Sequence, residues 1–156
     1  MKKTLSNRIN RLIIVISIVL ATVFFGLILN LNGYSQKREL SQVNYFLDTL
    51  LNQKKELLAN EIFSNQDEAI EATLEEFTAN EGILLGEVYS AYGDKLSSSG
   101  ESLNQEESID TKELKQEPSF RTEKLGDREL AVYTSGIVLG GENFGYIRLY
   151  YDIGPI

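Results

Sequence analysis

One uninterrupted apolar segment near the amino terminus constrains this chain more than any other feature. Residues 12–29 are aliphatic or Phe at all but three positions, and no charged residue occurs between Arg11 and Lys37. A helix rises about 1.5 Å per residue, so this segment would cover roughly 27 Å, close to the hydrocarbon thickness of a bilayer. We therefore expect a transmembrane helix over residues 12–31, and a wholly cytosolic protein is excluded.

The charges on the two sides of this segment indicate its orientation. Residues 1–11 carry four bases and no acid, which leaves 11 bases against 23 acids in the rest of the chain. Because positive charge flanking a membrane helix stays in the cytoplasm, we expect residues 1–11 to be cytoplasmic. Residues 34–156 would then lie outside the cytoplasm. Their acidity also excludes a nucleic-acid partner.

A cleaved signal peptide is the alternative interpretation of the same segment. A membrane anchor and a signal peptide both begin with basic residues and continue with an apolar stretch. The apolar part of a signal peptide, however, usually spans only about 7–15 residues. Gly33 and Ser35 form a small-x-small pair that would permit cleavage after Ser35. The anchor is the prediction that we carry forward, and cleavage stays open.

The residue inventory argues against catalysis. The sequence has no Cys and no His, which removes thiol and imidazole chemistry, disulfides and the usual zinc ligands. It contains no nucleophile elbow, P-loop or dinucleotide fingerprint. We therefore predict that the chain is not an enzyme and binds no cofactor or metal, with an oxygen-ligand site around Asp94 as a weaker alternative.

Residues 34–63 predict a long helix that follows the membrane segment, since this range contains no Gly or Pro after Tyr34. One apolar stripe at 3–4 spacing is interrupted at Lys54, and a second stripe begins halfway along. Two apolar faces predict two neighbours, the folded domain and the same helix of a second subunit. The first stripe, predicted as a homodimer seam, is Leu40, Val43, Leu47, Leu50 and Leu57, and the second is Leu51, Leu58 and Ile62. A helix packed only on its own domain, in a monomer, is the alternative.

A shorter acidic helix is predicted over residues 66–80. Asn65 followed by Glu68 has the spacing of a capping box at a helix start. Between Glu56 and Asp94 there are ten acids and no base, which indicates a solvated face.

The rest of the chain, residues 83–153, predicts an antiparallel sheet of about five strands. Tyr92 to Lys95 and Gly126-Asp127 are turn signals between strand-like segments, and residues 99–118 form a polar excursion. In the last strand Ile147, Leu149, Tyr151 and Ile153 share one face, opposite Tyr146, Arg148 and Tyr150. The predicted strands are 83–91, 95–98, 120–125, 129–138 and 144–153. The fold class is thus α+β.

Arginine and tyrosine side chains on these strands suggest a binding pocket. Arginine matches a carboxylate with two parallel hydrogen bonds, and tyrosine adds a directed donor. We predict that a small anion or polar metabolite contacts the sheet face of Arg148, beneath the 99–118 excursion. The other candidate ligand-binding residues are Arg121, Tyr133, Tyr150 and Tyr89. The alternative is a merely solvated or covered face, with Arg148 paired to a neighbouring acid.

Three segments resemble the extracytoplasmic sensor regions of bacterial membrane signalling proteins, of the CHASE and Cache kind. Residues 83–89 with 92–96 are similar to the first hairpin of such domains, residues 130–137 to their central strand, and residues 145–152 to their last strand. The turn at 92–94 reads Tyr-Gly-Asp, where a form like Asp-x-x-Gly is commoner. The resemblance implies a PAS-like fold. It also implies an input module of a histidine kinase, diguanylate cyclase or chemoreceptor, which binds a ligand and transmits a helix shift.

Such proteins usually leave the last sensor strand through a second membrane helix. This sequence stops at Gly154-Pro155-Ile156, so we expect the input half of a longer protein, or a truncated reading frame.

Two other functional classes stay open. A pilin or pseudopilin would need an acid near the start of its apolar helix, which residues 12–29 lack. An anchored adaptor would bind another protein through its acidic helix.

Overall fold

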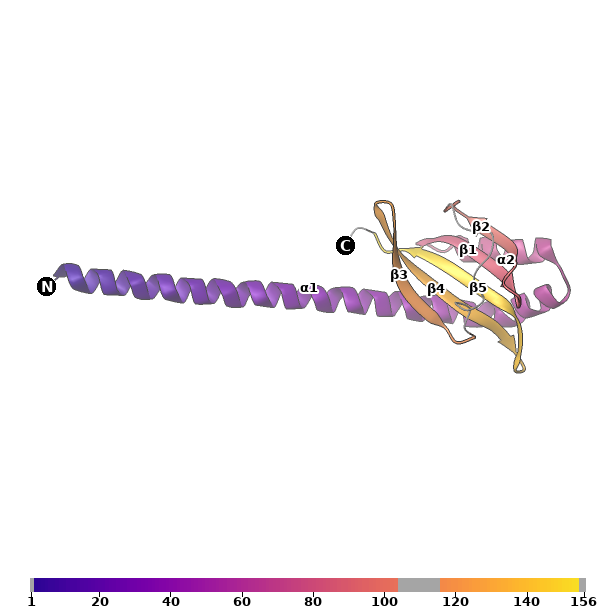
Figure 1. Cartoon of the computed structure of the whole chain (residues 1–156), viewed down its shortest axis with the longest axis horizontal. Helices are drawn as coiled ribbons and strands as arrows, with labels where there is room; N and C mark the ends of the chain where they lie inside the picture. Colours follow the sequence, from indigo (N-terminus) through magenta and orange to yellow (C-terminus); the bar gives the residue numbers. More distant parts are fainter. Residues whose placement is uncertain (1, 104–115, 155–156) are drawn as a thin grey trace. The chain divides into compact units, whose positions relative to one another are not determined.

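The computed structural model describes the backbone of residues 2–103 and 116–154, and the side chains of residues 16–26, 38–103 and 116–154 (Figure 1). The chain divides into two compact units, Met1–Glu39 and Leu40–Ile156, which are treated separately below. Helix α1 (Lys2–Phe63) runs through the boundary between them. The sequence predicted one helix over 12–31 and another over 34–63, whereas the structure has a single helix that continues through Gly33.

The first unit consists of the amino-terminal part of α1. Its described side chains are mostly aliphatic and aromatic, and they are exposed: Ile16, Val19 and Phe25 each expose half or more of their surface. Among the residues with described side chains, no helix is long and apolar enough to cross a membrane. Both ends of the predicted membrane segment, 12–15 and 27–31, lie outside that set.

The second unit contains the predicted α+β fold, with a five-stranded antiparallel sheet in the order β2-β1-β5-β4-β3. Each strand begins and ends within a few residues of its predicted bounds. The middle of the 99–118 excursion lies outside the described residues. The elements of this unit after α1 are α2 (Asp67–Thr78), β1 (Ile83–Ser90), β2 (Lys95–Gly100), β3 (Ser119–Leu125), β4 (Arg128–Leu139) and β5 (Glu142–Asp152).

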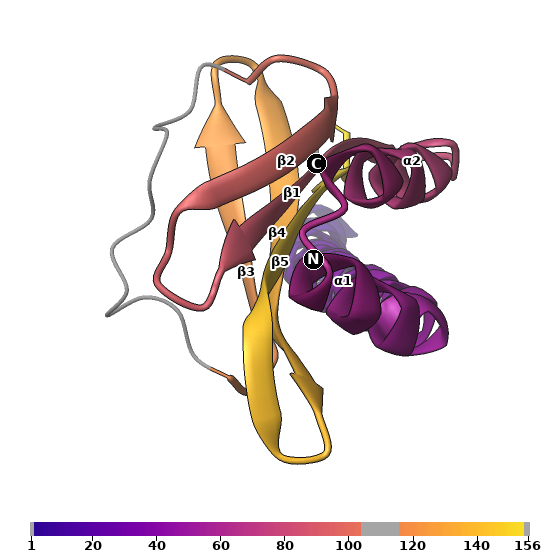
Figure 2. The same cartoon turned by 90° about the vertical axis from the view of Figure 1, so that its right-hand side faces the viewer.

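The helices α1 and α2 cover one face of this sheet, as Figure 2 shows. Alternate residues of the strands point toward them, so that Ile147 and Leu149 of β5 join Leu74 of α2 and Leu51 of α1 in one apolar cluster. Gly86 allows α2 to approach β1 closely, because a Cβ there would lie 3.0 Å from the Leu74 side chain. We call this the inner face, and it holds the larger part of the core.

The carboxyl-terminal half of α1 contributes one broad stripe to the inner face rather than two separate ones. Leu47, Leu51 and Leu58 are fully buried in the cluster, and Val43 and Leu50 pack against its margin. The structure therefore uses Leu47 for the core of its own chain, so a dimer seam would have to use other positions. Among the predicted seam residues, Leu57 is the one that remains exposed, at 44%.

The predicted capping box at Asn65 is wrong. Asn65 has a left-handed backbone with φ of 51°, and α2 begins after Gln66 without a side-chain cap. The amide of Gln66 donates to the carbonyl of Glu61, and the amide of Asn65 donates to the carbonyl of Ile62. This pair of bonds is a Schellman motif, which ends α1. Asn tolerates the left-handed conformation, so here it marks the end of one helix and not the start of the next.

Candidate functional site

The face of the sheet opposite α1 and α2, which we call the outer face, carries a row of polar side chains across all five strands. The strand register places Glu87 of β1 beside Arg148 of β5, and Arg148 beside Thr134 of β4. Directly paired residues of an antiparallel sheet project to the same side. The row is completed at the two edges by Ser98 of β2 and Ser119 of β3.

Glu87 is the centre of a buried hydrogen-bond network on this face. Its side chain is 1% exposed, and both carboxylate oxygens have partners. Lys95 Nζ on β2 donates to Oε1 at 2.6 Å. The Tyr89 hydroxyl donates to Oε2 at 2.6 Å, and the Tyr150 hydroxyl donates to the same oxygen at 3.3 Å. A buried carboxylate is stable only when it is paired and hydrogen-bonded in this way.

Arg148 joins this network from β5. It is 8% exposed, so the arginine that the sequence analysis placed on a pocket wall is buried. Its Nε donates to Thr134 Oγ1 at 3.3 Å, and a terminal nitrogen donates to the Tyr150 hydroxyl at 3.5 Å. Within the described part of the chain, no carboxylate forms an ion pair with it. The predicted alternative of a paired acid therefore does not hold among these residues.

The surroundings of this network raise the pKa values of two of its side chains, Tyr89 and Arg148. Burial, and then the hydrogen bond to Glu87, raises the pKa of the Tyr89 hydroxyl well above its usual range. Burial alone would lower the pKa of Arg148, but Tyr150, Tyr89 and Glu87 outweigh it and the net shift is upward. Tyr89 therefore stays neutral and Arg148 stays charged at any ordinary pH. Among the described residues, the network with Lys95 holds two positive groups and the carboxylate of Glu87.

A small cavity of about 190 Å³ opens beside this network at the β2 edge of the sheet. Glu87 and Lys95 form its charged wall. Drug-sized ligands occupy pockets of about 300–1,000 Å³, so this cavity suits a smaller molecule. A third charged residue, Glu101, also lines the cavity and pairs with Arg128 at 2.8 Å. The remaining lining is short polar residues with two leucines: Leu85, Ser98, Ser99, Gly100, Ser102 and Leu103. Arg148 does not line it and is connected to it through Tyr150 and Glu87.

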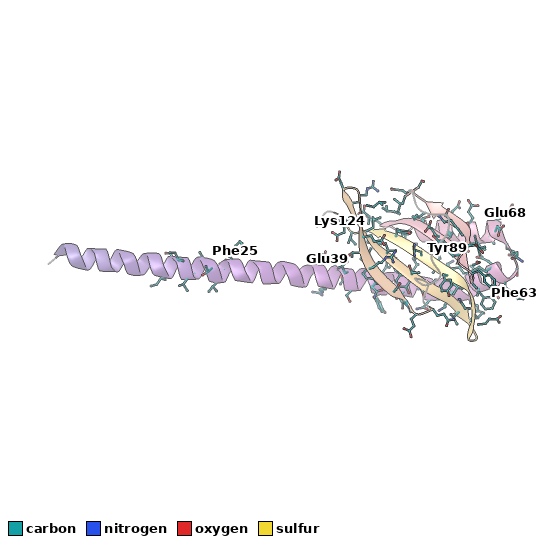
Figure 3. All side chains as sticks on the ribbon, viewed as in Figure 1. Phe25, Glu39, Phe63, Glu68, Tyr89 and Lys124 are labelled. Atoms are coloured by element: carbon teal, nitrogen blue, oxygen red, sulfur yellow. The ribbon has the colours of Figure 1, made fainter. Side chains whose placement is uncertain are left out.

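The structure brings together three of the five predicted ligand-binding residues, Arg148, Tyr150 and Tyr89, and separates the other two. Figure 3 labels Tyr89 within the sheet. Tyr133 points to the inner face, where its hydroxyl donates to Asp48 of α1 at 2.7 Å. Arg121 lies on β3, on the outer face but about half exposed, with its Nε 2.6 Å from Glu123. Burial raises the pKa of Tyr133, and the contact with Asp48 adds to that shift.

Sequence reasoning missed Glu87 and Lys95. The signal for Glu87 was present, because it is the one charged residue inside an otherwise apolar strand, 83–90. A lone charge in such a strand is buried and therefore needs a partner. Lys95 was predicted only as the end of a strand. It lies 8 residues after Glu87, and this spacing gave no indication that the two side chains meet.

Comparisons with known proteins address the family. Residues 1–152 match a family described as bacterial virulence factor haemolysin, and no curated protein matches the chain. Among solved structures, the chain is similar to the crystal structure of the V. cholerae histidine kinase DctB sensor domain, with a TM-score of 0.49 and 11% identity. That likeness covers 72% of this chain and 57% of the sensor domain, so the chain spans little more than half of its length.

The matched family is not of the CHASE or Cache kind that the three segments resemble. At 11% identity the likeness to the sensor domain carries no information about activity. The family match, by contrast, covers both units, including the apolar segment and the whole sheet. The chain therefore belongs to the bacterial virulence factor haemolysin family.

Proposed function

We propose that the second unit is an extracytoplasmic input domain that binds a small anion on its outer face, and that the first unit anchors it in the membrane. The observation that carries this proposal is the buried network around Glu87 and Arg148 beside a polar cavity. A sheet face that served only as core would be expected to bury apolar side chains, as the inner face does. Here an arginine and a carboxylate are buried as well, and the partly exposed Lys95 contacts the carboxylate.

The charge of the network favours an anionic ligand. Among the described residues of the network, Lys95 and Arg148 exceed Glu87 by one positive charge, in a chain whose net charge is −8. Within this part of the chain, the hydrogen bonds that Arg148 donates are long and go to neutral hydroxyls. A carboxylate or phosphate would supply the acceptors that a guanidinium prefers. The cavity volume limits the ligand to a few heavy atoms.

Strand β5 connects the site to α1, because its side chains point alternately to the outer and the inner face. Arg148 projects to the outer face from β5, whereas its neighbours Ile147 and Leu149 pack in the cluster that holds α1. A ligand that shifts β5 would therefore shift the packing under the helix, provided that it binds the two arrangements with different affinity. We propose this as the transmission step of the sensor.

The membrane anchor is supported by composition and exposure. The described side chains of residues 16–26 are exposed and apolar, which is costly in water and favourable in lipid. The four bases before them favour a cytoplasmic amino terminus. A reporter fused after Ile156 should be active only outside the cytoplasm, and activity of a cytoplasm-only reporter would refute this orientation.

A homodimer through α1 is the assembly that we propose for this input domain. Leu57 is the predicted seam residue that stays exposed, so it is the position to test. A Cys at Leu57 should crosslink between subunits in membranes, whereas a Cys at the exposed Glu56 should crosslink less. Equal crosslinking at the two positions would indicate random collision.

The binding proposal is tested with the full chain in a mild detergent, screened by thermal shift against acetate, malonate and inorganic phosphate. At least one of these anions should raise the unfolding midpoint in a concentration-dependent manner. Lys95→Met keeps the aliphatic stem but removes the charge at the cavity wall, and it should abolish that rise. If none of the three changes the midpoint of the wild type, the anion proposal is wrong.

The family description favours a second candidate function, membrane lysis. The match begins at residue 1, so the apolar segment belongs to the family pattern together with the domain. A lytic chain should release haemoglobin from erythrocytes, and a fragment of residues 40–156 should not. We propose no enzymatic activity for either candidate, because Glu87, the buried carboxylate of this network among the described residues, has both oxygens hydrogen-bonded.

A further inference from the structure

A second buried carboxyl group lies at the junction of α1 and α2, far in sequence from the Glu87 network. Glu61 is on the last turn of α1 and is 7% exposed. One of its oxygens accepts a hydrogen bond from Thr73 Oγ1 of α2 at 3.0 Å. The other oxygen is buried and has no hydrogen-bond partner among the residues that the structure describes. An ionised carboxylate with a buried, unpartnered oxygen is costly, whereas the neutral acid is tolerated.

The groups around Glu61 offset only part of this cost: the hydrogen bond from Thr73 and the charge of Lys54 lower the pKa of Glu61, but the net shift is upward. Lys54 lies two helical turns earlier on α1 and pairs with Glu76 of α2, so its charge is already shared with another acid. Glu76 itself repels a charge on Glu61. The inner-face residues of the sheet that join the shared cluster are uncharged, such as Val88, Ile147 and Leu149. Burial is the largest influence, and it raises the pKa of Glu61 above its ordinary value, with Glu76 acting in the same direction.

The position of Glu61 couples its charge to the geometry of the helix pair. Its backbone carbonyl accepts the Gln66 amide in the Schellman motif that ends α1, while its side chain bonds to α2 through Thr73. Figure 3 shows Phe63 and Glu68, which flank this connection, at the end of the domain opposite Lys124. A change at Glu61 therefore acts on both the end of α1 and the seating of α2.

We propose that Glu61 is held as a neutral carboxylic acid and that its ionisation loosens the junction of α1 and α2, which makes this helix pair a pH-responsive element. The sign follows from linkage. A group whose pKa is raised by folding contributes stability below its unfolded value of 4.5, and this contribution is lost as the pH rises through the folded value. The junction is therefore tightest in mild acid and loosens toward neutral pH.

The test compares Glu61→Gln with the wild type, both as the full chain in detergent. The neutral amide keeps an acceptor for Thr73 but cannot ionise. Thermal midpoints are measured from pH ~4 to pH ~8. The two proteins should have similar midpoints in acid, and the variant should gain roughly 3–6 °C over the wild type toward neutral pH. Glu75→Gln, at an exposed position of α2, is the control and should follow the wild type.

Parallel pH profiles for the wild type and Glu61→Gln would overturn the proposal, as would a control that gains as much as the variant. A second readout uses the wild type alone, so it does not depend on whether the variant folds. The infrared carbonyl band of a protonated carboxyl group should be present in the wild type in mild acid and should fade toward neutral pH. Amide exchange, corrected for its intrinsic pH dependence, should accelerate over residues 58–74 in the same range. A wild type without that band, or with unchanged exchange, contradicts the proposal.

Discussion

The two faces of the sheet are both buried, but they differ in composition: the outer face adds buried charged side chains to a small apolar cluster of Leu85, Leu130 and Val132. The inner face packs aliphatic and aromatic residues against α1 and α2, with Leu47, Leu58 and Leu149 fully buried. The outer face buries Glu87 and Arg148 with tyrosine hydroxyls between them. Apolar burial stabilises a fold without regard to direction, whereas a buried polar network requires defined geometry. The inner face therefore accounts for the fold, and the outer face is where specific binding is to be expected.

The largest expected effect comes from opening a cavity in the inner face. Leu47→Ala removes a side chain that is fully buried between α1 and the sheet, and it should lower the free energy of unfolding by about 2–5 kcal/mol. Urea denaturation measures this difference. Glu56→Ala, at an exposed position of the same helix, is the control, with an expected cost within about 0.5 kcal/mol. Leu57→Ala, at the proposed dimer seam, should instead lower stability in a way that depends on protein concentration.

The next effect comes from breaking the outer-face network at its centre. Glu87→Gln removes the charge that Lys95 and two tyrosine hydroxyls approach, and it should cost about 2–3 kcal/mol. Lys95 is partly exposed, which keeps the cost below that of a fully buried pair. Glu123→Gln, in the solvent-exposed pair with Arg121, should cost about 0–1 kcal/mol. If both variants cost the same, the network at Glu87 does not contribute to stability beyond an ordinary surface pair.

The smallest stability effect tests a polar contact of the inner face, between Tyr133 and Asp48. Tyr133→Phe removes the hydroxyl that donates to Asp48 and should cost about 1–1.5 kcal/mol, because the ring stays packed. Tyr45→Phe at an exposed position of α1 should be neutral. A cost for Tyr133→Phe as large as that of Glu87→Gln would mean that the two faces do not differ in their dependence on polar contacts.

Much of this fold could be predicted from the sequence. Alternation along residues 144–153 identified both faces of β5, and the turn at Gly126-Asp127 identified the β3–β4 hairpin. Local turn chemistry and period-2 patterns carry that information. The role of Leu47 could not be predicted, since a stripe of leucines does not say whether a sheet or a second helix will cover it. Asn65 was misread because the same residue type serves helix starts and left-handed helix ends.

The candidate site could be predicted only in part. Arg148 and Tyr150 alternate with core residues of β5, so their shared face followed from the pattern. Tyr133 was assigned to the site by residue type, but its register on β4 directs it to Asp48 on α1. The link between Lys95 and Glu87 depends on the register of β1 against β2, which includes an irregularity between Val88 and Tyr89. Sequence spacing alone does not carry such a shift.

The central claim is that the outer face binds an anion at the cavity wall that Lys95 forms, and the affinity of Lys95→Met tests it most directly. Titration calorimetry with the most stabilising of acetate, malonate and phosphate compares this variant with the wild type and with Lys124→Met, at an exposed lysine of β3. A charge-assisted contact contributes about 1.5–3 kcal/mol, so Lys95→Met should bind roughly ten- to a hundredfold more weakly, while Lys124→Met binds like the wild type. An unchanged affinity in a folded Lys95→Met variant would contradict the account.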